Sequence, residues 1–172
     1  MGKLNDMFIE LAEIFQDNML LQRNKPIRIW GIAKNTQRLS ILLDDIQVYD
    51  EEIPAGRFEI LLPPQETAEN RTLCIRNQEG KEIKIHNVDI GEVWIAGGQS
   101  NMEFPLLCDR NGDDVIKKAG DEHLRYYEVG KYAFEGEREE KLKDGHRWNH
   151  WRRFVPEECT HFSAVGTYFA RI

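Results

Sequence analysis

The stretch that decides the fold is Gly91-Glu-Val-Trp-Ile-Ala-Gly-Gly-Gln-Ser-Asn-Met-Glu103, in which an apolar run leads into two glycines and a serine. Val93–Ala96 has no polar alternation, which predicts a strand covered on both faces, as in a parallel sheet flanked by helices. Gly97 and Gly98 remove side-chain bulk, so the backbone can turn sharply and a ligand can approach it closely. The stretch therefore predicts a buried strand that ends in a glycine turn with Ser100 at its tip.

Ser100 has the surroundings of a nucleophile. A serine just after such a turn can stand where a helix begins, where backbone N–H groups are free and the positive end of the helix dipole faces a ligand. Such donors stabilise the oxyanion formed from an ester carbonyl, and removing one typically costs about 100- to 1,000-fold in rate. We predict that Ser100 is the nucleophile and that its N–H helps to hold the oxyanion. Gly98, Gln99 and Asn101 complete the predicted binding site, where they shape the turn. The tetrapeptide alone also fits an ordinary loop with Ser100 as a helix N-cap.

The same thirteen residues resemble the first motif block of the sialate O-acetylesterase-like carbohydrate esterases, a branch of the SGNH hydrolases. The resemblance implies a mixed β plus α/β fold, with an N-terminal β-sandwich of the Ig or jelly-roll kind over residues 1–89. Residues 90–172 would be the first strands and helices of a truncated SGNH-type α/β/α catalytic domain. Four further blocks match in the same order: Phe15–Arg23, Ile29–Gly31, Gly56–Pro63 and Phe162–Arg171.

The first half of the chain has the pattern of a β-sandwich on its own evidence. Short runs of apolar or alternating residues are separated by turn residues, and eight of them at this spacing are typical of two packed sheets. Ile27–Ile32 alternates clearly, so one face of that strand is expected to pack inward and the other to face water. The predicted strands are Phe8–Ala12, Met19–Gln22, Ile27–Ile32, Arg38–Leu43, Ile46–Tyr49, Phe58–Leu62, Thr72–Arg76 and Glu82–Val88.

The periodicity changes after the serine turn. Asp113–Gly120 predicts a short helix, with acids at its start and a glycine stop. His123–Val129 predicts a second buried strand, which would follow the first by a strand–helix–strand route. Residues 131–147 are highly charged and predict a solvated surface loop. Thr160–Arg171 predicts an amphipathic helix.

Composition excludes several classes of partner. The 172 residues are 41% hydrophobic and carry a net charge of −7 with a pI near 5.3. This acidity argues against nucleic acid or an anionic membrane surface as partner. No apolar run approaches the ~20 residues that span a bilayer. The N-terminus has no signal-peptide pattern, and three unpaired cysteines at unrelated spacings predict reduced thiols in a cytoplasmic protein, although a longer natural N-terminus would leave secretion open.

The base that a serine nucleophile needs is missing from these residues. The resemblance implies a histidine in an Asp-x-x-His motif near the C-terminus of a much longer chain, and none of the five histidines here follows that pattern. His161 follows Glu158 at the right interval, but it precedes a helix block where the family carries no base. The remaining histidines are predicted to be surface groups: His86, His123, His146 and His150. The aromatic cluster Trp148–Arg153 fits two interpretations: its rings stack on a sugar, or a buried tryptophan anchors a long loop.

Two functions of different class follow. The preferred one is a serine carbohydrate O-acetylesterase that acts on an acetylated sugar, without a metal or organic cofactor, although these 172 residues alone would be inactive. The rival is a non-catalytic module whose sandwich binds a sugar or another partner. The sequence does not choose among sialic acid, xylan and other acetylated sugars. In either case self-association through exposed sheet edges is expected if the catalytic sheet is incomplete.

Overall fold

The computed structural model describes residues 8–130 and 148–172. The chain divides into two compact units between Val93 and Trp94. The sequence places the domain boundary between residues 89 and 90, whereas the last strand of the first unit continues to Gly91. The predicted surface loop at 131–147 lies outside the described residues.

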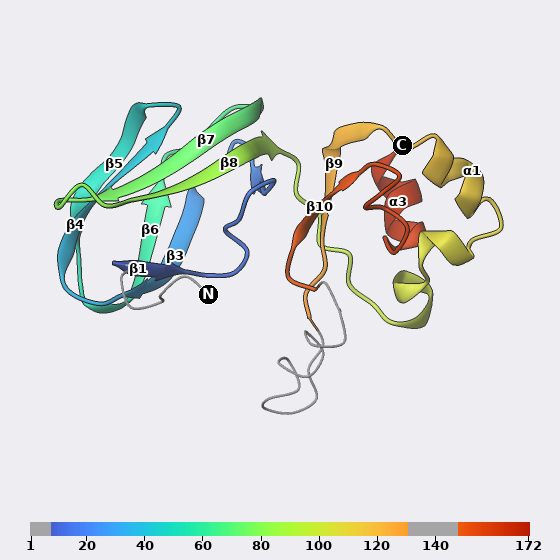
Figure 1. The fold of residues 1–172 in the computed structure, drawn as a ribbon, viewed down its shortest axis with the longest axis horizontal. Coiled ribbons are helices and arrows are strands. Elements are labelled where there is room, and N and C mark those ends of the chain that lie inside the picture. The colour runs from blue at the N-terminus through green and yellow to red at the C-terminus, as the bar shows by residue number, and fades with distance from the viewer. Residues whose placement is uncertain (1–7, 131–147) are drawn as a thin grey trace. The chain divides into compact units, whose positions relative to one another are not determined.

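The first unit consists of eight strands, and each of the eight strands expected from the sequence is confirmed (Figure 1). Several are longer than predicted, because pairing with a neighbour carries a strand into polar residues that have no strand preference of their own. The strands are β1 (Ile9–Leu11), β2 (Leu20–Gln22), β3 (Ile27–Ala33), β4 (Gln37–Leu43), β5 (Ile46–Ile53), β6 (Gly56–Leu62), β7 (Ala68–Asn77) and β8 (Glu82–Gly91).

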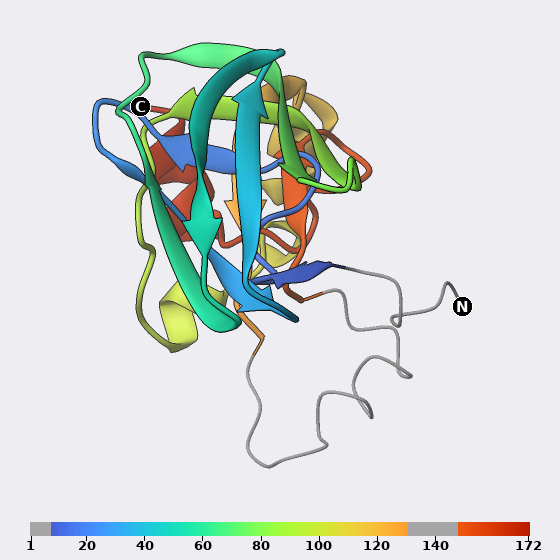
Figure 2. The ribbon, with the colours of Figure 1, turned by 90° about the vertical axis from the view of Figure 1, so that its left-hand side faces the viewer.

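These strands form two sheets, one of three strands in the order β1-β3-β6 and one of five in the order β2-β8-β7-β4-β5. All neighbours are antiparallel except β2 and β8, which run parallel. Figure 2 shows the same sandwich turned by 90°. The parallel pair places Leu20 beside Asp89 and Gln22 beside Gly91, so two sequence blocks about 70 residues apart meet where the chain leaves the sandwich.

Alternation along the strands builds the sandwich core. On β3, Ile27, Ile29 and Ala33 are buried while Arg28 and Trp30 are exposed, as the sequence pattern predicts. The inward-facing positions of β4, β6, β7 and β8 supply most of the remaining core: Leu39, Ile41, Phe58, Ile60, Leu62, Leu73, Ile75, Ile85, Val88 and Ile90. Gly31 is required for a different reason, because a Cβ there would lie 2.2 Å from the carbonyl oxygen of Glu10 on β1.

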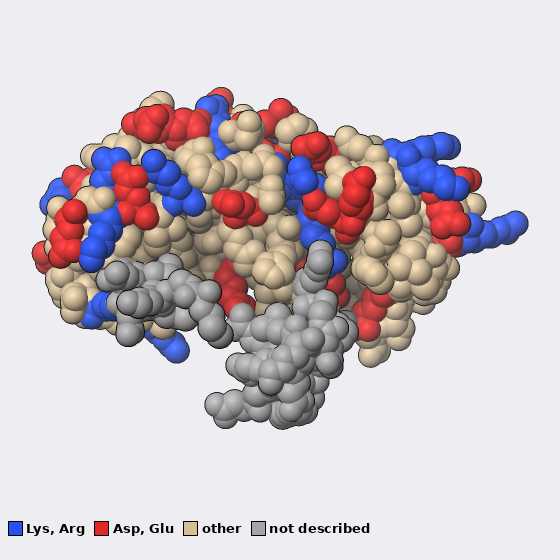
Figure 3. Space-filling view, viewed as in Figure 1, with Lys and Arg blue, Asp and Glu red and all other residues tan. Residues whose placement is uncertain are grey.

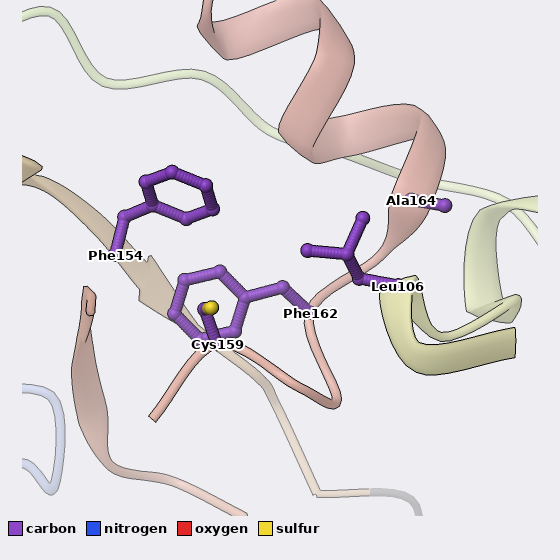
Figure 4. Packing of buried hydrophobic residues seen from close by; sticks show 5 residues of the cluster. All are labelled: Leu106, Phe154, Cys159, Phe162 and Ala164. Atoms are coloured by element: carbon purple, nitrogen blue, oxygen red, sulfur yellow. The ribbon is translucent and has the colours of Figure 1, made fainter. Parts of the chain in front are cut away.

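The second unit contains a two-stranded sheet and short helices. Its elements are the 3₁₀ helices η2 (Ser100–Glu103) and η3 (Leu106–Cys108), the helices α1 (Gly112–Lys117) and α3 (Ala164–Ala170), and the strands β9 (Asp121–Tyr127) and β10 (Trp151–Phe154). The predicted helices at 113–120 and 160–171 are confirmed as α1 and α3, each shorter than the prediction. Figure 4 shows the core of this unit near the start of α3: Leu106, Phe154, Cys159, Phe162 and Ala164.

Two expectations for the second unit are wrong. Val93–Ala96 forms no strand, and Trp94 and Ile95 are 70% and 97% exposed, because no strand of the described residues covers this apolar run. β9 does exist, but it pairs antiparallel with β10 instead of following Val93–Ala96 as a parallel neighbour. In the Trp148–Arg153 cluster, Trp148 and Trp151 are half-buried, and Trp151 begins β10 and packs against the ring of Tyr127 at 5.2 Å between centroids.

The surface is mixed in charge. On the face shown in Figure 3, acidic and basic side chains are interspersed, without the basic stripe that a nucleic acid would need. Among residues 8–130 and 148–172, none of the helices is long and apolar enough to cross a membrane. The three cysteines are free thiols, of which Cys74 and Cys159 are buried.

Candidate functional site

Ser100 is an exposed residue at the first position of η2, immediately after the glycine turn. Gln99, not Ser100, is the N-cap of this helix, and its side chain makes no capping hydrogen bond. The structure therefore contradicts the alternative in which Ser100 serves as the cap. A helix of four residues has almost no dipole, so what this turn offers a ligand is free N–H groups.

The backbone of Ser100 lies in the left-handed region, with φ of +47°. Eight non-glycine residues of the described chain have positive φ, and the other seven are all asparagine or aspartate, which adopt this conformation most readily. Ser100 has no such preference, so its conformation is imposed by its surroundings. Backbone strain of this kind, roughly 1–3 kcal/mol, collects at functional sites and also occurs in the strand-to-helix turn that exposes a serine nucleophile.

Free backbone donors lie at the same turn. In a 3₁₀ helix the first N–H to find a helical acceptor is that of the third residue, and here the N–H of Met102 donates to the carbonyl of Gln99 at 3.0 Å. Within the described residues the N–H groups of Ser100 and Asn101 donate to no acceptor. Both side chains are exposed, as is that of Gln99. The predicted site residues are thus together at one exposed turn.

Hydrogen bonds with Gln22 and Arg23 fix the backbone where the chain leaves the sandwich. Arg23 Nε donates to Glu92 Oε1 at 2.6 Å, and Gln22 Nε2 donates to Glu92 Oε2 at 3.1 Å. The hydrogen bond from Arg23, followed by that from Gln22, holds the pKa of the Glu92 carboxyl below its ordinary value. The N–H of Val93 in turn donates to Gln22 Oε1 at 3.0 Å. The motif block that contains the serine therefore begins on a polar clamp supplied by β2 and the residue after it.

The segment after Ser100 is fastened to the start of α3. The N–H of Leu106 donates to the carbonyl of Phe162 at 2.8 Å, and the N–H of Ala164 donates to the carbonyl of Phe104 at 2.9 Å. Ser163 caps α3, with its Oγ accepting from the N–H of Gly166 at 3.1 Å. Sequence reasoning missed this attachment, although Ser163 before a helical run is a recognisable N-cap signal.

The histidines do not complete a catalytic group in these residues. His86, His123, His150 and His161 are exposed, as predicted for the first three, and His146 lies outside the described residues. Glu158 does not orient His161, because its two oxygens accept from the backbone N–H of Arg153 at 2.7 Å and from Arg153 Nη2 at 2.8 Å. Across the described part of the chain, no group of three or more His, Cys, Asp or Glu side chains is arranged to hold a metal ion.

The chain is similar in sequence and in fold to carbohydrate acetylesterases of known name. No family model matches the chain. It is 37% identical over 60 residues to the sialate O-acetylesterase of Rattus norvegicus, a match that covers 35% of this chain and 9% of that protein. The structure of a carbohydrate acetylesterase from Xanthomonas citri matches 95% of this chain with a TM-score of 0.80 and 27% identity. The chain covers 36% of that second protein, so it spans about a third of its length.

Proposed function

We propose that this chain, which resembles the sialate O-acetylesterase-like carbohydrate esterases in sequence and in fold, carries the nucleophile of an enzyme that removes acetyl groups from acetylated sugars. The proposed nucleophile is Ser100. The acetyl-ester chemistry is supported by the two relatives, whose names state activities on acetylated carbohydrates. The acetylated carbohydrate, sialic acid included, is the proposed substrate class.

The proposed reaction is acyl transfer. Ser100 Oγ attacks the acetyl carbonyl while its proton passes to a histidine base, and the N–H of Ser100 donates to the developing oxyanion. The C–O bond to the sugar breaks, the sugar oxygen takes up the proton, and water then releases acetate from the acyl-serine. We propose that the base belongs to an Asp-x-x-His segment that residues 1–172 do not contain. The 172-residue chain tested alone should then be inactive.

One observation carries this proposal: Ser100 is held exposed in a left-handed backbone conformation two residues after Gly98. In a surface loop that has no function, such a residue would adopt an unstrained backbone conformation. The strain costs about as much free energy as one good hydrogen bond contributes to stability. The two free N–H groups at the same turn are the further geometric support, because the oxyanion must form within reach of such donors.

Ser100→Ala in the full-length gene product tests the nucleophile. The variant should lose at least about a thousandfold in acetyl release from 4-nitrophenyl acetate and from acetylated sialic acid, because removal of a nucleophile typically costs several orders of magnitude. Ser40→Ala in β4 is the matched control and should keep wild-type turnover. Equal thermal melting of the three proteins excludes unfolding as the cause. More than about a tenth of wild-type activity in Ser100→Ala would overturn the assignment.

The rival function is a non-catalytic sugar-binding module, and one observation favours it: none of the five histidines lies in an Asp-x-x-His motif. The two functions predict different results with the same ligand. A binding module would bind deacetylated and acetylated sugar through residues 1–93 without releasing acetate, and Ser100→Ala would leave that binding unchanged. Calorimetric titration of wild type and Ser100→Ala with both sugars separates the two.

A further inference from the structure

We infer that Ser163 is a positioning residue, which holds the Ser100 turn in its strained conformation by a hydrogen bond to Met102. The inference rests on the proposed function of Ser100. It assigns a role to a side chain that follows Ser100 by 63 positions in the sequence and that contacts Met102, not the reacting atoms.

The hydroxyl of Ser163 has two partners, one that it accepts from and one that it donates to. Its oxygen accepts from the N–H of Gly166 at 3.1 Å, and its O–H is directed to the sulfur of Met102, with 3.4 Å between Oγ and Sδ. Ser163 is only 2% exposed. A buried hydroxyl must have such partners, because leaving a polar group unpaired costs about 1–3 kcal/mol. One side chain therefore caps α3 and at the same time fastens Met102.

Met102 transmits this restraint to both sides of Ser100. Its N–H donates to the carbonyl of Gln99 at 3.0 Å, which closes the backbone across Ser100. Its Cβ lies 3.1 Å from the position that a Cβ on Gly98 would occupy, so the side chain packs directly on the glycine turn. Gln99 and Ser100 are thus enclosed between two contacts made by Met102.

The backbone around this contact is attached independently of the hydroxyl. Pro105 and Ser163 form an isolated antiparallel bridge, and the N–H of Ala164 donates to the carbonyl of Phe104. These bonds remain when only the side chain of Ser163 or Met102 is changed. Loss of the hydroxyl should therefore leave the segment docked on α3, while the Met102 side chain gains freedom and the Ser100 backbone relaxes toward an unstrained conformation.

Three variants separate positioning from capping. Met102→Leu removes the sulfur acceptor at nearly constant volume and leaves the α3 cap intact. Ser163→Ala removes both the hydrogen bond to Met102 and the cap of α3. Ser163→Thr keeps a hydroxyl that can make both. Thr167→Ala, at another buried position of α3, is the control for a general loosening of that helix.

Hydrogen exchange followed by mass spectrometry on the full-length gene product gives a readout that needs no activity. In Met102→Leu and Ser163→Ala, peptides covering residues 97–104 should exchange about five- to tenfold faster than in wild type, the effect expected for one lost hydrogen bond. Met102→Leu should leave residues 164–171 unchanged, and Ser163→Thr should match wild type throughout. Unchanged exchange at 97–104 in both variants would overturn the inference, as would an equal acceleration there in Thr167→Ala.

Turnover of an acetyl ester supplies the second readout. If the wild-type protein is active, Met102→Leu and Ser163→Ala should lower kcat about tenfold or more with KM within twofold, because a displaced nucleophile affects the chemical step more than binding. Ser163→Thr should restore kcat. Wild-type kcat in both variants would refute the positioning role. If the wild-type protein releases no acetate, the proposed function of Ser100 fails, while hydrogen exchange still decides whether Ser163 holds the turn.

Discussion

Gly98 is the residue on which the geometry of the serine turn depends most directly. Its φ of +156° is one that residues with a side chain rarely adopt, and a Cβ there would meet the Cβ of Met102 at 3.1 Å. Gly98→Val in the full-length gene product should therefore lower acetyl release at least a hundredfold while the protein stays folded. Gly97→Ala is the matched control, because a Cβ at Gly97 meets no atom within 4 Å. Full turnover in Gly98→Val, with circular dichroism unchanged, would show that Gly98 is only a linker.

Glu158 contributes a pH dependence to the stability of the second unit. Burial raises the pKa of its carboxyl, but the hydrogen bonds from the side chain and backbone of Arg153 outweigh burial and leave the pKa below its ordinary value. A depressed pKa stabilises the fold above the ordinary glutamate value of about 4.3, and this stabilisation is lost as the pH falls through the lower, folded-state pKa.

Thermal melting between pH 7 and pH 3 checks this sign. Glu158→Gln should lower stability by about 1 kcal/mol at pH 7, and the difference from wild type should shrink as the pH falls through the lowered pKa of the wild-type carboxyl. Glu157→Gln, at the neighbouring exposed residue, is the control for the change in net charge. A constant difference between Glu158→Gln and wild type across the range would contradict the role of the ion pair.

At the scale of elements, the apolar run after the sandwich, Val93–Ala96, leaves large apolar side chains exposed. Ile95 is 97% exposed, and Val165 and Phe169 on α3 are 48% and 51% exposed. The ring of Trp94 makes an edge contact with that of Phe169 at 5.3 Å between centroids. Contiguous apolar surface of this kind favours association, because burying it removes apolar area from water.

Ile95→Lys should reduce self-association of the 172-residue chain, whereas Ile46→Lys should not. Both isoleucines are largely exposed, but Ile46 begins β5 at a hairpin of the sandwich and is not part of the apolar run. Sedimentation velocity over a tenfold range of protein concentration measures the effect. A wild-type chain that stays monomeric over this range would contradict the prediction that the exposed run drives association.

At the scale of the whole molecule, the two units should differ in their resistance to protease. The sandwich has its own core and paired strands, so it should survive limited digestion as a fragment that ends close to Val93. Thermolysin or chymotrypsin should cut first at Trp94 and Ile95, which are exposed and outside any strand. The charged run at 131–147 is also expected to be cut early, from its composition alone. Mass spectrometry of the fragments over time measures this, and uniform resistance through Arg171 would contradict it.

The strands of the sandwich could be predicted from the sequence because the patterns that indicate them are local. The alternation in Ile27–Ile32 follows from the two-residue period of a strand, and the turns are marked by proline and glycine. The pairing of these strands could not be predicted from the sequence. The parallel pairing of β2 with β8, and with it the clamp of Arg23 on Glu92, depends on contacts between residues 69 positions apart.

The glycine turn with Ser100 at its tip was likewise determined by the sequence alone, because the adjacent Gly97 and Gly98 permit a sharp turn that other residues avoid. The fate of Val93–Ala96 was not, since an apolar run becomes a buried strand only when other strands cover it. The left-handed backbone of Ser100 and its attachment to Ser163 through Met102 were decided by tertiary structure. Strain and a contact across 61 residues leave no periodic trace in a sequence, because they arise only when distant segments pack together.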